Sequence, residues 1–205
     1  MAVEQIYENA VDTPGEKRII KYVMLPSFAV VLSLGSNRPH AGLPPPAILR
    51  AACGRIGLRV WGLQSSSIYL TKPLYYGGQP DFYNLVCCGA FQAESPCGAE
   101  AGARELLRFT QSVEAAFGRD RSRETPKGPR SLDIDILLFG GERIQLAELV
   151  IPHPGITERA FVLEPLLEIL PKSADPITGR KYADFRDSVK NQGVARLEGE
   201  KYGRI

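Results

Sequence analysis

The chain has 205 residues, of which 44% are hydrophobic and 23% are charged, and its formal net charge is +2. These values are ordinary for a globular domain that buries a substantial core, and so small a net charge does not indicate a nucleic acid partner. No apolar run reaches the ~18 residues that a transmembrane helix needs, and the four cysteines include no Cys-x-x-Cys pair of the kind found in zinc sites.

The first 26 residues form a polar segment that differs from the rest of the chain. Glu4, Glu8, Asp12 and Glu16 argue against a mitochondrial presequence, and the segment lacks the apolar stretch of a secretory signal. We therefore expect an N-terminal arm over residues 1–26, a single domain over residues 27–205, and a cytoplasmic protein.

Four apolar runs after this arm predict β-strands. They are rich in β-branched and aromatic residues and are bounded by turn-forming residues. They span residues 28–34, 58–69, 83–91 and 132–139. Long loops over residues 71–81 and 119–130, rich in glycine, proline and charged side chains, precede the last two strands.

Two helices are predicted between these strands. Pro44 to Pro46 stand where the first one begins. Ser95 and Pro96 predict the N-cap and first turn of the second, which Gly118 ends. A last helical region around residues 161–163 is interrupted by Pro165. The order of elements predicts an α+β fold, a ferredoxin-like β-α-β-β-α-β antiparallel sheet with helices on one face and long active-site loops.

Two carboxylates in the last predicted strand are the sharpest local feature. Alternation along a strand puts Asp133 and Asp135 on one face, with Ile134 and Ile136 on the other. Two neighbouring acids repel each other and resist burial, so they need a compensating cation. Oxygen ligands without nearby histidine or cysteine favour Mg²⁺. An exposed polar face paired with arginine and lysine is the alternative interpretation.

The loop before this strand favours the magnesium interpretation. It gathers cationic side chains at Arg119, Arg121, Arg123, Lys127 and Arg130. Guanidinium groups bind phosphate oxygens and neutralise charge in phosphoryl transfer. The chain has no Walker loop and no dinucleotide fingerprint, so an ATP site must be built in another way.

Several further segments complete a pattern that can be recognised as a whole. In chain order they are 34–37 (LGSN), 67–71 (SIYLT), 79–84 (QPDFYN), 128–137 (GPRSLDIDIL), 151–154 (IPHP), Arg159 and 161–163 (FVL). With these, the chain resembles the 6-hydroxymethyl-7,8-dihydropterin pyrophosphokinase family of folate biosynthesis over residues 28–197.

The resemblance implies transfer of pyrophosphate from ATP to a pterin alcohol, with release of AMP. It implies two Mg²⁺ ions held by Asp133 and Asp135, and catalytic roles for these acids with Arg119, Arg121 and Arg130. The nucleotide would be surrounded by Gln111, Glu114, Arg121, Arg130, Ile136, His153 and Arg159. The pterin would be bound by Thr71, Leu74, Phe82, Asn84 and Phe161.

The resemblance also has limits. Pro126-Lys127 stands where the family often has Arg-Trp, so an indole platform is missing from the loop. A ferredoxin-like RNA-binding module is one alternative, although it needs aromatics on its central strands where this chain has carboxylates. A non-catalytic relative and a module split from a multifunctional folate enzyme are others. We expect ATP and the pterin as small-molecule partners, other folate-pathway enzymes as candidate physical partners, and neither nucleic acid nor membrane.

Overall fold

The computed structural model describes residues 25–73, 78–94, 97–121 and 128–197. Its core elements are β1 (Ser27–Ser36), α1 (Pro45–Ile56), β2 (Val60–Ser65), β3 (Tyr69–Thr71), β4 (Phe82–Gln92), α2 (Ala99–Ala116) and β5 (Asp133–Phe139). They are followed by β6 (Ile144–Gln145), β7 (Val150–Ile151), η1 (Pro154–Ile156), α3 (Ala160–Ile169), η2 (Tyr182–Phe185), α4 (Arg186–Val189), η3 (Lys190–Gln192) and β8 (Val194–Arg196).

The main sheet is antiparallel throughout. Its strands lie in the order β5-β1-β4-β3-β8, and β2 also pairs with β4. The single strand predicted over residues 58–69 is two short strands, β2 and β3. The Ser66 hydroxyl between them accepts the Val86 N–H at 3.0 Å, and the pairing register with β4 shifts by one residue from β2 to β3. The α+β class is confirmed.

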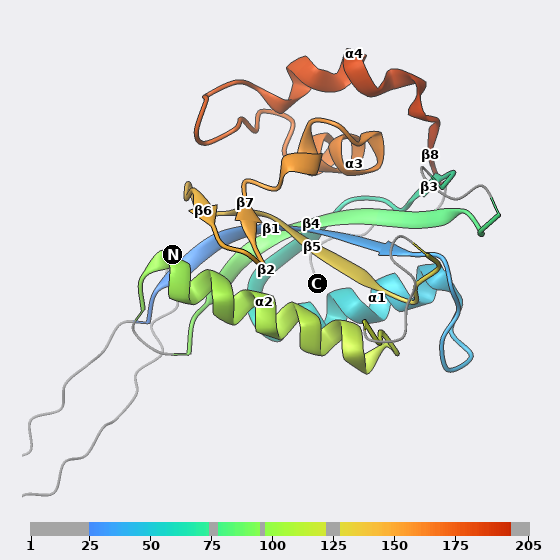
Figure 1. The fold of residues 1–205 in the computed structure, drawn as a ribbon, viewed down its shortest axis with the longest axis horizontal. Helices are drawn as coiled ribbons and strands as arrows, with labels where there is room; N and C mark the ends of the chain where they lie inside the picture. The colour runs from blue at the N-terminus through green and yellow to red at the C-terminus, as the bar shows by residue number, and fades with distance from the viewer. Residues whose placement is uncertain (1–24, 74–77, 95–96, 122–127, 198–205) are drawn as a thin grey trace, which may run out of the picture.

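Helices cover both faces of this sheet (Figure 1). α1 and α2 pack on one face, over an apolar cluster that includes Leu32, Leu85 and Ile134. α3 and the segment after it pack on the opposite face, over Val31 and Val86 among others. The prediction that the helices lie on one face is wrong, because the second face also carries apolar side chains that need cover.

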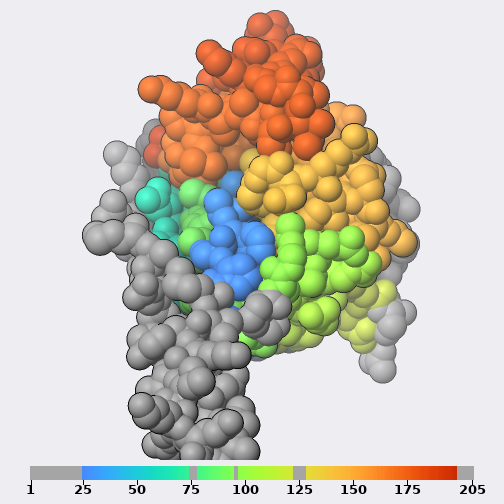
Figure 2. Space-filling model, turned by 90° about the vertical axis from the view of Figure 1, so that its left-hand side faces the viewer, coloured from blue at the N-terminus to red at the C-terminus, as the bar shows by residue number. Residues whose placement is uncertain are grey.

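The C-terminal part of the chain forms this second layer. In Figure 2 its orange and red residues gather above blue β1, on the side away from green α2. α3 continues through Pro165 as one helix, so the predicted interruption there is wrong. Nearly all of its side chains are apolar and most are buried, and this burial outweighs the one hydrogen bond that proline removes.

The ends of the first two helices test the capping predictions. α1 begins with Pro45, as expected. α2 begins at Ala99 with Gly98 as its N-cap, later than predicted, and residues 95–96 lie outside the described part of the chain. Gly118, at a φ of +79°, ends α2 as predicted, since its left-handed backbone cannot continue the helix.

The second face of the sheet is apolar at one end and polar at the other. The apolar end, with Val31, Val86 and Leu137, lies in the cluster under α3. The polar end lies two and four residues further along the same strands, on the same face. Its residues are Ser33 and Gly35 of β1, Asn84 and Phe82 of β4, and Asp135 and Asp133 of β5. The polar end is left open beside α3. Among the described residues, no helix is long and apolar enough to cross a membrane.

Candidate active site

A cavity of about 300 Å³ lies over the polar end of the sheet. Strand residues form part of its lining, and residues from the loops and from the start of α3 form the rest. Those lining it are Ser33, Gly35, Thr71, Lys72, Gln79, Phe82, Asn84, Arg119, Arg121, Arg130, Asp133, Asp135, His153, Arg159 and Phe161. The structure thus brings together most of the residues that the sequence singled out.

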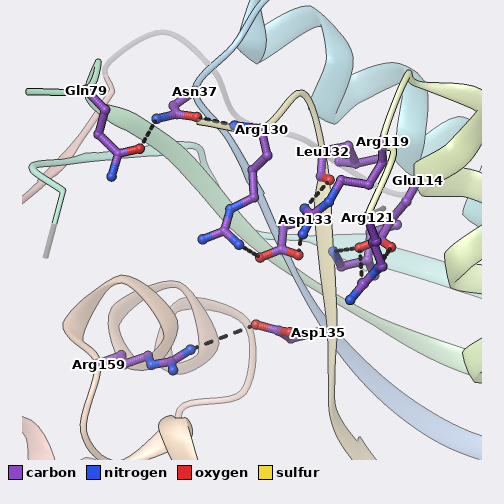
Figure 3. Close-up of polar contacts among 11 residues, drawn as sticks. Asn37, Gln79, Glu114, Arg119, Arg121, Arg130, Leu132, Asp133, Asp135 and Arg159 are labelled. Carbon is purple, nitrogen blue, oxygen red and sulfur yellow. Dashed lines mark hydrogen bonds and ion pairs between the residues drawn. The ribbon is translucent and has the colours of Figure 1, made fainter. Parts of the chain in front are cut away.

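Two arginines hold the carboxylate of Asp133. Arg119 donates to its Oδ1 at 2.9 Å, and an Arg130 guanidinium nitrogen lies 2.9 Å from its Oδ2 (Figure 3). Arg119 also donates to the Leu132 carbonyl at 2.9 Å, which fixes the guanidinium at the start of β5. The Arg119 side chain is only 10% exposed, so these charge-assisted bonds are partly shielded from water.

Asp135 is much less well compensated than Asp133. Its nearest cation in the described residues is Arg159, whose guanidinium nitrogen lies 3.9 Å from Oδ2 (Figure 3). Burial raises the pKa of Asp135, and the charge of Asp133 raises it further, against the opposing effects of His153, Arg159 and Arg130. The acid pair is therefore a place where a further cation would be stabilised.

Glu114 ties the α2 helix to the strand that carries the acids. Its buried carboxylate accepts the backbone N–H of Ile134 at 2.8 Å and bonds from the Arg121 guanidinium at 2.7 to 3.2 Å. Burial raises the pKa of Glu114, although both hydrogen-bonding partners oppose this shift. Glu114 therefore aims Arg121 at the cavity and does not itself line it.

Asn37 is a site residue to which sequence reasoning assigned no role. Its buried side chain accepts the Arg130 N–H at 2.8 Å and donates to Gln79 Oε1 and the Pro80 carbonyl at 3.2 and 3.1 Å (Figure 3). It thereby joins the loop before β4 to the loop before β5. Its place in the 34–37 motif, directly after an apolar strand, was the available signal.

Asn84 forms a polar point in the floor of the cavity. It is buried, and its side-chain nitrogen donates to Thr71 Oγ1 at 2.9 Å. Gly35 stands opposite on β1, and a Cβ atom there would lie 3.1 Å from Asn84 Oδ1. The missing side chain at Gly35 therefore leaves the Asn84 amide accessible from the cavity.

Each of the two cavity phenylalanines is paired with an arginine. The Arg130 guanidinium lies 5.5 Å from the centre of the Phe82 ring, and that of Arg159 lies 5.8 Å from Phe161. These contacts are within the range of cation–π attraction. The rings come from β4 and α3, so an aromatic ligand and an anionic one could be held by neighbouring groups.

His153 lies at the edge of the cavity, with one ring nitrogen bound to the backbone. Its Nδ1 accepts the Gly155 N–H at 3.0 Å, and burial lowers the pKa of its imidazole against the opposing charge of Asp135. A proton is thus left on Nε2, which can donate to a ligand. Gly155 also makes room for Arg159, because a Cβ there would lie 2.9 Å from Arg159 Nε.

The model of the 7,8-dihydro-6-hydroxymethylpterin-pyrophosphokinase family matches residues 31–171. The chain belongs to this family.

The chain is also similar in sequence to curated proteins of folate synthesis, which it covers to different extents. The chain is 36% identical to the folic acid synthesis protein fol1 of Pneumocystis carinii over 168 residues, 81% of this chain and 21% of that protein. It is 43% identical over 104 residues to the Bacillus subtilis 2-amino-4-hydroxy-6-hydroxymethyldihydropteridine pyrophosphokinase, covering 51% of this chain and 56% of that enzyme. The Pseudomonas aeruginosa enzyme of the same name is 34% identical, covering 65% and 76%.

The chain thus spans about a fifth of the fungal protein and about half of the Bacillus enzyme. Among solved structures, wild-type Plasmodium falciparum HPPK-DHPS has a TM-score of 0.58 at 14% identity, covering 80% of this chain and 45% of that one. At this identity the likeness supports the fold.

Three residues expected around the nucleotide, Gln111, Glu114 and Ile136, do not line the cavity. Gln111 is exposed on α2. Ile136 is buried in the cluster under α1 and α2, as the alternation of β5 requires, so its side chain cannot contact a nucleotide in the cavity. Leu74, predicted beside the pterin, lies outside the described residues, and so do Arg123 and the replaced pair Pro126-Lys127.

The acid pair fits the magnesium ions expected for such a site. The described residues contain no cluster of three or more histidine, cysteine or acidic side chains. Mg²⁺ does not require one, because it is commonly held by one or two carboxylates together with water and substrate phosphates. Asp133 and Asp135 share one face of β5, line the cavity and repel each other, which is the charge arrangement that a divalent ion relieves.

Proposed function

We propose that this chain transfers the pyrophosphoryl group of ATP to the hydroxymethyl group of 6-hydroxymethyl-7,8-dihydropterin in folate biosynthesis. The pterin hydroxyl oxygen forms a bond to the β-phosphorus of ATP and releases its proton to solvent, while the bond from that phosphorus to the α-phosphate oxygen breaks and AMP leaves. One observation carries the proposal. A single cavity contains an acid pair, several arginines and two phenylalanines, in a chain of the pyrophosphokinase family.

The charge of the cavity supports a polyphosphate ligand. Among the described residues, its lining includes the cations Lys72, Arg119, Arg121, Arg130 and Arg159 and two carboxylates, Asp133 and Asp135. Arg121, Arg130 and Arg159 would contact the phosphates, and His153 with its Nε2 proton would donate to the nucleotide. Positive groups fixed around a transferring phosphoryl group are the main protein contribution to such reactions. Glu114 would act by holding Arg121.

Asp133 and Asp135 would hold the magnesium ions, two in number according to the family resemblance. Bound there, the ions would neutralise the phosphate oxygens as charge shifts during transfer. The protein would supply the two carboxylates, and Arg119 and Arg130 would keep Asp133 in place. When substrate is absent, the same arginines act as counter-ions to the acid.

The opposite part of the cavity is suited to the pterin. Phe82 and Phe161 offer two aromatic faces for a flat heterocycle. Asn84, oriented by its bond to Thr71, would hydrogen-bond the ring through the carboxamide oxygen that Gly35 leaves open. A buried amide of this kind discriminates against ligands that cannot satisfy it.

The wider organisation of the chain is also part of the proposal. We take residues 27–205 as one pyrophosphokinase domain with an elaborated ferredoxin-like topology, preceded by an arm. The Arabidopsis thaliana relative is called a mitochondrial folate synthesis bifunctional protein, and it is 36% identical over 146 residues. This name supports a further folate-pathway enzyme as a physical partner, while a cytoplasmic location stays a prediction.

AMP formation tests the proposed activity directly. The wild-type chain, incubated with ATP, Mg²⁺ and the hydroxymethyldihydropterin, should release AMP, and Asp135→Asn should not. Asp187→Asn is the matched control, because Asp187 is a 97% exposed carboxylate on α4. Calorimetry with a non-hydrolysable ATP analogue should show pterin binding that nucleotide and Mg²⁺ strengthen. Absence of AMP under all these conditions would overturn the assignment, and RNA binding without pterin binding would favour the RNA-binding alternative.

A further inference from the structure

Gln192 lies in the C-terminal segment, beyond the residues that match the family model. Its side chain makes two hydrogen bonds to the backbone just before α3. Nε2 donates to the Glu158 carbonyl at 2.7 Å, and Oε1 accepts the Ala160 N–H at 2.9 Å. One amide group thus bonds to the residues on both sides of Arg159.

These bonds fix the backbone at the residue where α3 begins. Arg159 is the N-cap of α3 but provides no side-chain cap itself, and its backbone is extended, with φ −124° and ψ 113°. The first N–H groups of a helix lack partners within the helix, and Gln192 satisfies one of them from another part of the chain. The two bonds restrain the backbone on both sides of Arg159.

The restrained backbone carries the Arg159 side chain, which lines the cavity. Its guanidinium lies 3.9 Å from Asp135 and 5.8 Å from the centre of the Phe161 ring. It also packs closely over Gly155, where a Cβ atom would come within 2.9 Å of it. A small rotation of the backbone at residue 159 would therefore move the guanidinium away from the acid pair or into Gly155.

We propose that Gln192 is a positioning residue that holds Arg159 at the cavity, so that the C-terminal segment takes part in the site. This inference rests on the proposed pyrophosphokinase function. β8, which follows Gln192 closely, pairs with β3, where Thr71 lies opposite Val194. The segment therefore contacts elements on two sides of the cavity, α3 through Gln192 and β3 through β8.

A mutant cycle separates positioning from a merely structural role. Gln192→Leu removes both hydrogen bonds at similar volume, and we expect kcat/KM for ATP to fall about tenfold, as for a misplaced catalytic group. In the Arg159→Ala background the same substitution should have no further effect. Gln192→Glu keeps the acceptor for Ala160 but places a carboxylate oxygen against the Glu158 carbonyl, so it should not restore activity. Asn191→Ala, in the exposed neighbouring residue, should match the wild type.

An equal loss from Gln192→Leu with and without Arg159 would overturn the positioning role and leave a structural one. A second measurement does not depend on turnover. The NMR signal of the Arg159 Nε–H group should shift or broaden in Gln192→Leu and stay unchanged in Asn191→Ala. An unchanged signal in both variants would refute the inference even for an inactive chain. An inactive wild type with the expected signal change would instead count against the proposed function alone.

Discussion

Neutralising the two acids of β5 should have the same effect on turnover but opposite effects on the free energy of unfolding. Replacing either with asparagine should abolish turnover, because each is expected to hold magnesium. Their effects on folding should differ in sign. Asp133 has a guanidinium nitrogen at 2.9 Å from each oxygen, whereas Asp135 has one at 3.9 Å. Asp133→Asn should destabilise the protein, and Asp135→Asn should stabilise it at neutral pH.

The size of the Asp133 effect follows from its contacts. A hydrogen bond to a charged group contributes about 1.5–3 kcal/mol. Asparagine keeps one acceptor, loses one bond and the charge, and relieves the repulsion of Asp135. The side chains of Asp133 and Arg130 are 21% and 23% exposed, so water screens part of the loss. We therefore expect a net destabilisation of about 2 kcal/mol.

The sign for Asp135 follows from its raised pKa. A carboxyl group whose pKa is higher in the folded protein binds protons more readily there than in the unfolded chain. Its contribution to the free energy of unfolding is therefore unfavourable above the folded pKa, and this cost disappears as the pH falls below the unfolded value. Asp135→Asn should raise stability at pH 7 and remove this part of the pH dependence.

Urea unfolding with EDTA present, at pH 7 and near pH 4, measures both effects without divalent ions. Asp187→Asn supplies the control for loss of an exposed carboxylate. Adding Mg²⁺ with an ATP analogue should then stabilise the wild type but neither acid variant. Stabilisation by Asp133→Asn, or destabilisation by Asp135→Asn at pH 7, would show that the arginine contacts do not govern the acid pair in the way described.

Three further substitutions test the arginine and pterin contacts. Arg130→Ala should raise the barrier to AMP formation by about 2–4 kcal/mol, as for loss of a charge-stabilising donor, and an unchanged initial rate would place Arg130 outside the reacting groups. Asn37→Ala should cost about 1–3 kcal/mol in urea unfolding, because the buried Arg130 N–H loses its acceptor; a loss no larger than that of Asn191→Ala would argue against the link. Gly35→Ala should weaken pterin binding about tenfold in calorimetry, because the added methyl group crowds Asn84. Nucleotide affinity should stay unchanged. Equal losses of affinity for both ligands would indicate general distortion of β1.

The strands and the acid pair could be predicted because they depend on local alternation. β1, β4 and β5 lie close to their predicted ranges, and Ile134 and Ile136 face the core opposite the acids. The same alternation already argues against Ile136 as a nucleotide contact. The family resemblance implied that contact, and it could not say whether backbone or side chain was meant.

The contacts that pair the charges could not be read from the sequence. The basic loop predicted cations near phosphate, but not that Arg119 and Arg130 would hold Asp133 between them. Asn37 and Gln192 act on residues 93 and 32 positions away in the chain. The break at Ser66 depends on a hydroxyl competing for one backbone N–H of a neighbouring strand. Such contacts depend on tertiary packing, which local patterns do not encode.

The position of the cavity follows from how far α3 extends over the sheet. Val31, Val86 and Leu137 lie in the apolar cluster that α3 covers. Two residues further along each strand, away from that cluster, stand Ser33, Asn84 and Asp135, which line the cavity. Apolar side chains need the cover, whereas carboxylates would resist it. Arg159, the residue just before α3, therefore stands where the apolar half of the face meets the acidic half.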